Sequence, residues 1–193
     1  MSRVKRIWYP GAIYHIVTRG NNKQNIFLAK EDYWQFMNYL RRVHEKYPFD
    51  LYSYCLMSNH VHLQIATKDT EIWTIMRGIN WSYSKYFNAK YDKVGHLFQN
   101  RYHSEIIKDD AYLLQTSKYI HLNPVKAGIV DQPAKYPWSS YGVYMGITKN
   151  TLIHEDDTLA YFQYDRTLYK RFVESEDSDD DDCLQVIQAV PGT

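Results

Sequence analysis

The sequence predicts an α+β fold, a ferredoxin-like or RRM-like sandwich in which a four-stranded antiparallel sheet carries helices on one face and a tyrosine-bearing helix over the other. Three observations lead to it: the order of the segments, the strict alternation of polar and apolar residues through 60–65, and two long amphipathic stretches. The order is strand, helix, strand, strand, helix, strand, helix, and its first six elements match such a sandwich.

The elements follow from periodicity and from turn residues. The predicted strands are residues 12–18, 51–57, 60–66 and 101–107, and the predicted helices are residues 31–47, 71–91 and 111–122. Gly20 breaks the first strand and Pro48 ends the first helix. A tight turn at Ser58-Asn59 joins the second and third strands into a hairpin.

Cap residues place the ends of the later helices. Thr70 is the expected N-cap of the second helix, and Asp109 or Asp110 caps the third. The third helix is expected to end near Asn123 because Pro124 follows it. Beyond it, a packed loop is expected over 133–141 and one or two helices over 157–172.

Charge is unevenly distributed along the chain. The 193 residues carry a net charge of +1, but residues 174–182 hold seven acids; the remaining 15 acids against 23 Lys and Arg leave residues 1–173 at +8. A basic body in which 16% of the whole chain is aromatic suits nucleic acid. The acidic tail, expected to be disordered, either keeps the protein soluble or mimics nucleic acid and competes for the basic surface.

Length and composition set the domain organisation and the compartment. We expect one domain over 1–145, a helical extension over 146–173 and the acidic tail over 174–193. No apolar run reaches membrane-spanning length, the N-terminus lacks the core of a signal peptide, and two cysteines imply no disulfide framework. A cytoplasmic protein is therefore expected.

Two pairs of residues could carry chemistry. His60 and His62 lie on one face of a strand, where two imidazoles can hold a divalent cation or simply hydrogen-bond at a sheet surface. Tyr119 and Asn123 share one face of a helix, together with Tyr112. A tyrosine can act as a nucleophile or merely pack, and an asparagine oxygen could complete a cation site. Nitrogen and oxygen ligands without thiolates suit Mn²⁺ or Mg²⁺ rather than structural zinc.

Four motifs in order resemble the single-tyrosine transposases of the HUH superfamily, and most of all their REP-associated branch. They are Leu56-Met57-Ser58-Asn59-His60-Val61-His62-Leu63, Tyr14-His15-Ile16-Val17-Thr18-Arg19-Gly20-Asn21-Asn22, Gly95-His96-Leu97-Phe98-Gln99-Asn100-Arg101-Tyr102-His103-Ser104 and Tyr119-Ile120-His121-Leu122-Asn123-Pro124-Val125-Lys126-Ala127-Gly128. The likeness covers roughly residues 3–145 and continues more weakly to about 173.

This resemblance implies a role for each site residue. Tyr119 matches the nucleophile, His60 and His62 match two metal ligands, and Asn123 matches the third, which is a glutamine in the insertion-sequence branch. The implied activity is sequence- or hairpin-specific cleavage and strand transfer on single-stranded DNA through a 5′-phosphotyrosine intermediate, with Mg²⁺ or Mn²⁺ as cofactor. The expected partner is single-stranded DNA with hairpins or palindromic repeats, bound by a monomer or a homodimer.

Other residues are expected to bind the DNA or to deprotonate the tyrosine. The candidate nucleic-acid contacts are the basic N-terminal arm and residues of the motifs: Arg3, Lys5, Arg6, Arg19, Asn21, Asn22 and Arg101. Gln64 and His121 are the candidates for assisting deprotonation of Tyr119, although His121 lies about 200° round the helix from it.

Two other function classes compete with a transposase. The segment 60–66 also resembles the histidine-triad signature of nucleotide hydrolases, in which His62 would be the nucleophile and no metal would be required. A four-stranded sheet with an open aromatic face is also how small, non-catalytic nucleic-acid-binding modules work. Retention of both histidines, Tyr119 and Asn123 favours the enzyme over the binding module.

Overall fold

A computed structural model of the protein describes residues 7–175, which form one four-stranded antiparallel sheet and the helices around it. In chain order the elements are β1 Ile13–Arg19, α1 Lys30–Lys46, β2 Phe49–Met57, β3 His60–Thr67, α2 Ile72–Tyr91, β4 His103–Ile107, α3 Asp110–Lys126, α4 Tyr141–Tyr144, α5 Glu155–Leu159 and α6 Arg166–Glu174. The strands lie in the order β2-β3-β1-β4. The predicted element order and fold class are confirmed.

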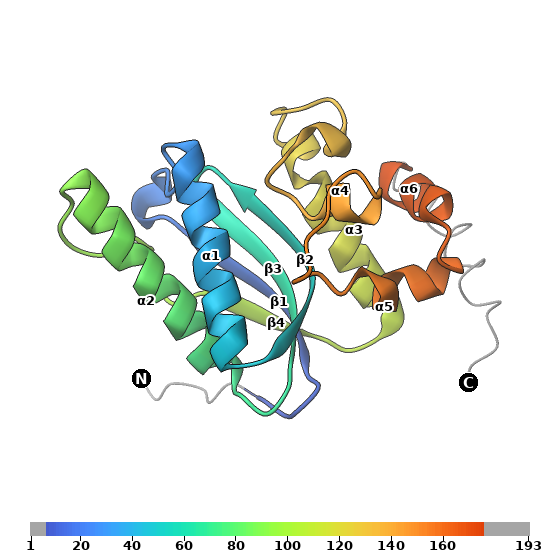
Figure 1. Ribbon diagram of the computed structural model, residues 1–193, viewed down its shortest axis with the longest axis horizontal. Coiled ribbons are helices and arrows are strands. Elements are labelled where there is room, and N and C mark those ends of the chain that lie inside the picture. Colours follow the sequence, from blue (N-terminus) through green and yellow to red (C-terminus); the bar gives the residue numbers. More distant parts are fainter. Residues whose placement is uncertain (1–6, 176–193) are drawn as a thin grey trace.

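The sheet is sandwiched between two helical layers (Figure 1). Helices α1 and α2 cover one face, and α3 lies over the other together with α4, α5 and α6. Alternation along the strands assigns the faces: Ile16 and Leu63 are fully buried in the main core. The neighbouring positions His15, His62 and Gln64 are therefore left on the face that α3 covers.

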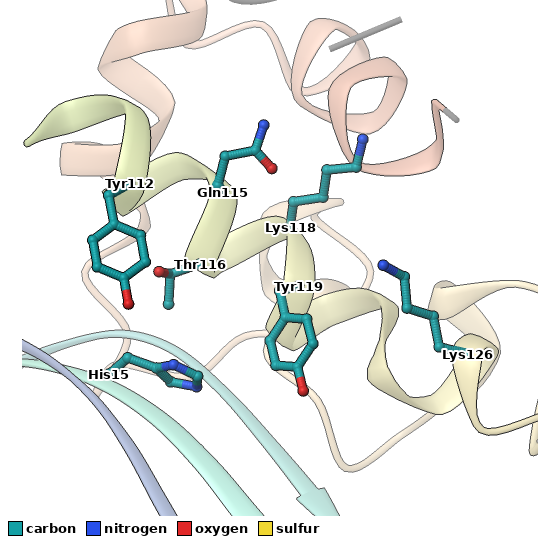
Figure 2. Close-up of a pocket in the computed structure, with 7 residues that line it drawn as sticks. All are labelled: His15, Tyr112, Gln115, Thr116, Lys118, Tyr119 and Lys126. Carbon is teal, nitrogen blue, oxygen red and sulfur yellow. The ribbon is translucent and has the colours of Figure 1, made fainter. Parts of the chain in front are cut away.

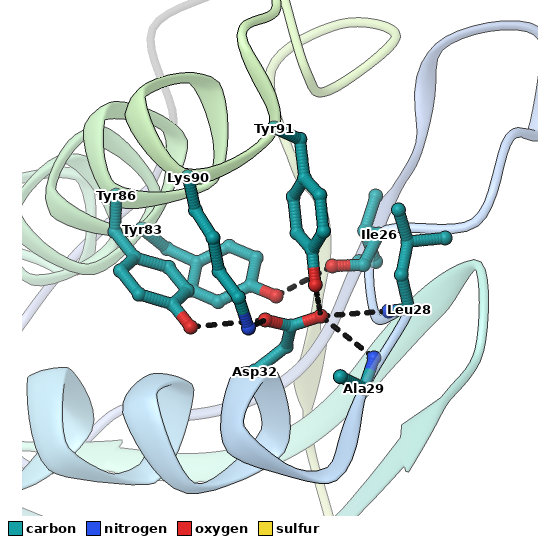
Figure 3. A network of polar contacts seen from close by, with 8 residues as sticks. All are labelled: Ile26, Leu28, Ala29, Asp32, Tyr83, Tyr86, Lys90 and Tyr91. Atoms are coloured by element: carbon teal, nitrogen blue, oxygen red, sulfur yellow. Dashed lines mark hydrogen bonds and ion pairs between the residues drawn. The ribbon is translucent and has the colours of Figure 1, made fainter.

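One buried carboxylate fastens the first helical layer (Figure 3). Asp32, near the start of α1, has no exposed surface. It accepts hydrogen bonds from the amides of Leu28 and Ala29, the hydroxyls of Tyr86 and Tyr91, and the ammonium of Lys90. Because the last three belong to α2, Asp32 both caps α1 and ties the two helices together.

Several helix and strand ends differ from the sequence prediction by one or two residues, and three differences affect caps or strand and helix length near the site. The N-cap of α2 is Glu71 rather than Thr70, and β4 begins at His103 rather than at residue 101. Helix α3, capped by Asp109 as expected, continues through Pro124 to Lys126 instead of ending near Asn123. A proline removes only its own N–H bond, and the next turn is kept because the amide of Ala127 donates to the carbonyl of Asn123.

The C-terminal helices secure α3 from behind. The Tyr169 hydroxyl of α6 lies 2.7 Å from Ser117 Oγ and 2.8 Å from His121 Nδ1, both on α3. The expected acidic tail starts inside this layer, because Glu174 is the last residue of α6 and accepts a hydrogen bond from Tyr141. Residues 176–193, the rest of that tail, lie outside the described residues. Among the helices of residues 7–175, none combines the length and apolar character that crossing a membrane needs.

Candidate active site

His60 and His62 lie at the start of β3, next to the turn that joins β2 and β3, and the loop after β1 is hydrogen-bonded to this turn. The Ser58 carbonyl accepts from the amides of Ile26 and Phe27, and the Asn59 carbonyl accepts from the amide of Gly20. A side chain at Gly20 would place its Cβ 2.2 Å from the Gln24 carbonyl oxygen, so only glycine lets the loop approach this closely. The strand that carries the histidines therefore starts from a fixed point.

His60 and His62 present neutral imidazoles side by side. Their ring centroids are 4.9 Å apart. Burial, assisted by the charges of His60 and His15, lowers the pKa of His62 to about 3, and burial also lowers the pKa of His60. His60 Nδ1 lies 2.6 Å from the Asn59 side-chain oxygen, which can only accept. His60 Nδ1 therefore carries a proton, and a hydrogen bond with the Asn123 side chain raises the pKa of His60 against the effect of burial.

Asn123 and His15 fix the orientation of His62 from either side. Asn123 Nδ2 lies 3.3 Å from His62 Nε2, and His15 Nε2 lies 3.1 Å from His62 Nδ1. Since the amide nitrogen donates to Nε2, the proton of His62 is on Nδ1 and is donated to His15. His62 thus holds its Nε2 lone pair free of a proton, the state in which an imidazole binds a metal.

His15 is the site residue for which the sequence suggested no role. It belongs to one of the motifs, but its place beside His62 depends on the antiparallel pairing of β1 with β3, in which Val17 faces His62 and His15 faces Gln64. Its ring stacks on that of His62 with centroids 5.3 Å apart. Alternation within residues 12–18 puts His15 on one face, but only the strand order brings that face to His62.

Tyr119 reaches the same place from α3. Its ring centroid lies 5.4 Å from that of His62 and 5.9 Å from that of His15, and 43% of the residue is exposed. Figure 2 shows Tyr119 and Tyr112 pointing from α3 toward the strand of His15, on the wall of a cavity of about 330 Å³. Tyr112 is held there by a 2.8 Å hydrogen bond to Glu105. The Lys126 ammonium lies 6.0 Å from the Tyr119 ring centroid.

Gln64 and His121, the candidates for assisting deprotonation of Tyr119, instead hold α3 in place. Buried Gln64 accepts from Ser53 and donates to the Leu113 carbonyl of α3, at 2.8 and 2.9 Å. His121 is fully buried and its ring nitrogens contact Tyr169 and Ser140. Neither side chain is free to serve Tyr119, because both are needed where α3 meets the sheet and α6. For His121 this agrees with its expected place on another face of the helix.

A divalent cation fits the donor set at this site. His60 and His62 offer nitrogen lone pairs, and the Asn123 amide supplies an oxygen once it turns from His62, which leaves further positions for substrate oxygens and water. Within residues 7–175 no cluster of three or more His, Cys, Asp or Glu side chains is placed to bind a metal. Among the residues gathered here, the Asn123 amide is the group that would supply a third protein ligand.

The candidate DNA-binding residues fall into three places. Arg19 ends β1 directly opposite His60, and exposed Asn21 and Asn22 follow it. Arg101 lies apart from them, on a cavity beside α2. The basic arm with Arg3, Lys5 and Arg6 lies outside the described residues.

Comparison with known proteins agrees with the motifs. The model of the family described as "Transposase IS200 like" matches residues 9–123. A Haemophilus influenzae protein whose name places it among REP-associated tyrosine transposases is 27% identical over 154 residues, which cover 73% of this chain and 86% of that protein. The REP-associated tyrosine transposase of Escherichia coli is 22% identical over 146 residues, covering 73% and 83%.

One solved structure shares the fold over most of the chain. It is a REP-associated tyrosine transposase bound to a REP hairpin, with a TM-score of 0.65, 19% identity, and coverage of 80% of this chain and 98% of that one. The family match spans more than half of the sequence, includes the two histidines, Tyr119 and Asn123, and favours a transposase over the histidine-triad alternative. The chain therefore belongs to the IS200-like transposase family of enzymes.

Proposed function

We propose that this protein cuts and rejoins single-stranded DNA next to a hairpin, with Tyr119 as the nucleophile. The observation that carries the proposal is the meeting of Tyr119 with His62 and Asn123 across the interface between α3 and β3. The hairpin as substrate is supported by the similar structure that holds a REP hairpin and by the charge of +8 on residues 1–173.

The cleavage step is a transesterification. Tyr119 Oη attacks the phosphorus, an O–P bond forms to the tyrosine, and the bond from phosphorus to the 3′ oxygen breaks. The 3′ oxygen takes a proton and leaves as a hydroxyl, while the phenol gives up its proton. Attack by a 3′-hydroxyl on the phosphotyrosine reverses these changes and joins strands, so no nucleoside triphosphate is consumed.

The surrounding residues position and stabilise the reacting groups. His60, His62 and Asn123 would hold Mg²⁺ or Mn²⁺, which when bound supplies positive charge against the phosphate oxygens. His15 keeps His62 in the tautomer that leaves Nε2 free. Lys126 lies on the same cavity as Tyr119, where its charge stabilises negative charge on the reacting oxygens.

The test is to trap the covalent product. Hairpin oligonucleotides taken from the flanks of the gene are labelled at the 3′ end, because that fragment keeps the 5′ phosphate and stays on the tyrosine. They are incubated with protein and Mg²⁺ or Mn²⁺ and run on a denaturing gel. We expect a slow-migrating labelled band that is lost with a chelator and in Tyr119→Phe, while a 5′ label follows a released fragment with a 3′-hydroxyl.

Tyr112→Phe is the matched control, since Tyr112 lines the same cavity from the same face of α3. It is expected to keep the covalent band. Hairpin binding without any band, for every flank and either metal, would reject the proposed cleavage and favour the non-catalytic binding module. A band that persists in Tyr119→Phe and disappears in Tyr112→Phe would show that Tyr112, and not Tyr119, is the nucleophile.

A further inference from the structure

Gln64 joins the strand of the two histidines to the helix of Tyr119 in the protein interior. Its side chain has no exposed surface, and it follows His62 by two residues on the same face of β3. Its amide nitrogen donates to the Leu113 carbonyl of α3 at 2.9 Å, and its oxygen accepts from the Ser53 hydroxyl of β2 at 2.8 Å. One side chain therefore connects β2, β3 and α3.

The partners of Gln64 fix the direction in which its amide points. A backbone carbonyl can only accept a hydrogen bond, so the NH₂ end of the amide must face Leu113. The hydroxyl of Ser53 then donates to the other end. A carbonyl oxygen has two lone pairs, so Leu113 can accept from Gln64 and still take part in the hydrogen bonds of its helix. Both ends of the buried amide are therefore satisfied in this one arrangement.

Helix α3 needs such a directional contact because much of its buried surface is polar. Thr116, Ser117, Lys118 and His121 are all buried on this helix. Apolar packing is non-directional, whereas a hydrogen bond to the backbone holds a helix at one position along its axis. A satisfied polar group in the interior specifies one arrangement of the elements that it joins. Gln64 is placed to do this for α3 and β3.

Two other contacts between α3 and the sheet are weaker. Asn123 Nδ2 lies 3.3 Å from His62 Nε2, but this contact is lost when the amide turns to offer its oxygen to a cation. Tyr112 donates to Glu105 at an exposed site, where a hydrogen bond gains little over one to water. The bond from Gln64 to α3 is buried and does not have to break during the reaction.

The connection from His62 through Gln64 to Tyr119 is short and stiff. Two strand residues span about 7 Å, and the six residues from Leu113 to Tyr119 span about 9 Å of helix. A shift of α3 along its axis therefore moves Tyr119 Oη by the same amount relative to His62. A slide by one residue moves it by about 1.5 Å, and misplacing a reacting group by about 1 Å can slow a reaction by about 10²-fold.

We propose that Gln64 is a positioning residue, which holds Tyr119 at the distance from the histidine pair that cleavage requires. This inference rests on the proposed function, because it assigns Gln64 to the cleavage step. Gln64 acts through the backbone of α3 and touches no reacting atom. Its loss is expected to slow the attack by Tyr119 and to leave hairpin binding unchanged.

The test removes the bond from Gln64 to Leu113 in two ways. Gln64→Met keeps a side chain of similar length and volume but has no hydrogen-bond donor. Gln64→Asn keeps the amide and shortens its reach by one methylene, and it serves as the second variant if Gln64→Met does not fold. Ser53→Ala is the matched control, because it removes the other hydrogen bond of the same amide and leaves the one to Leu113.

Two measurements on the full-length protein separate cleavage from binding. The first is the single-turnover rate of covalent band formation at saturating hairpin and Mn²⁺. This rate should fall about 10–100-fold in Gln64→Met and stay that of wild type in Ser53→Ala. The second is the Kd for the hairpin, from fluorescence anisotropy in EDTA, which should equal that of wild type in both variants.

Two further measurements need neither metal nor DNA. In protein labelled with fluorotyrosine, the fluorine NMR resonance of Tyr119 is the one missing from Tyr119→Phe, and it reports the surroundings of that ring. We expect this resonance to shift in Gln64→Met and to stay in place in Ser53→Ala. Urea unfolding should show a loss of stability in both variants, because each leaves a buried polar group without its partner.

The outcomes separate positioning by Gln64 from the proposed function. A wild-type rate in Gln64→Met and Gln64→Asn would overturn the inference and leave the proposed function intact. Cleavage that slows in Ser53→Ala as much as in Gln64→Met would show that both act through stability alone, which also overturns it. If wild type itself forms no covalent band, the proposed function fails. The inference fails separately if the Tyr119 resonance does not move in Gln64→Met.

Discussion

Removal of the charge on Asp32 gives the sharpest test of the fold. The carboxylate is fully buried, and five donors converge on it from the N-terminus of α1 and from α2 (Figure 3). Burial alone would raise its pKa, but the bonds from Lys90, Tyr91 and two backbone amides outweigh burial and lower the pKa to about 2. Folding therefore favours the charged form, and the charge in turn stabilises the fold.

The expected size follows from this pKa. The difference between 3.8 in the unfolded chain and about 2 in the folded chain corresponds to about 2.4 kcal/mol. Solvent screens part of it, because the Lys90 side chain is 30% exposed, which leaves ~1–2 kcal/mol. Asp32→Asn also replaces one acceptor oxygen by an amide NH₂ group, which faces donors that have lost their acceptor. These unpaired donors lower the free energy of unfolding by a further ~1–2 kcal/mol. The free energy of unfolding should fall by about 2–4 kcal/mol at pH 7.

Urea unfolding followed by tryptophan fluorescence measures this loss. Asp131→Asn is the control, because the salt bridge of Asp131 with Lys135 is exposed and its loss should leave stability close to that of the wild type. Since the folded pKa of Asp32 is depressed, its contribution is complete above pH 5, about half lost by pH 3, and lost as the pH falls through 2. A difference between Asp32→Asn and Asp131→Asn of less than 0.5 kcal/mol at pH 7, on the order of ordinary surface substitutions, would refute the reasoning.

Three further outcomes follow from other contacts of the site and of α3. His15→Phe keeps a flat ring against His62 but removes the hydrogen-bond acceptor. The affinity for Mn²⁺ without DNA, measured by electron paramagnetic resonance, should therefore weaken about 10–100-fold and recover in His15→Gln. Equal affinity in His15→Phe would show that His62 needs no orienting partner. Burial lowers the pKa of His121 to about 3, below its usual 6.5 in the unfolded chain. The free energy of unfolding should therefore drop by up to about 1.4 kcal/mol per pH unit as the pH falls from 6 to 4. In His121→Gln the free energy of unfolding should depend less steeply on pH, and a slope equal to that of wild type would contradict this role of His121. Lys126→Ala should slow formation of the covalent band about tenfold in a time course, with Lys135→Ala as the surface control, and an unchanged rate would exclude a role for this ammonium.

The sequence alone determined the parts of the site that depend on local geometry. A strand repeats every two residues, so His60 and His62 had to share a face wherever that strand lay. A helix repeats every 3.6 residues, so Tyr119 and Asn123 had to share a face as well. For the same reason the element order, and with it the fold class, could be predicted from hydrophobic periodicity and turn residues.

Only the tertiary structure decided which faces meet. His15 reaches His62 because β1 pairs with β3, and Gln64 holds the α3 backbone at Leu113 because α3 crosses that face of the sheet. Pro124 remains inside α3 because a later turn and buried packing compensate for one missing N–H, which a local rule does not include. Pairings of this kind join residues far apart in the chain, so no local spacing carries them; they follow from the simultaneous burial of every apolar face in the fold.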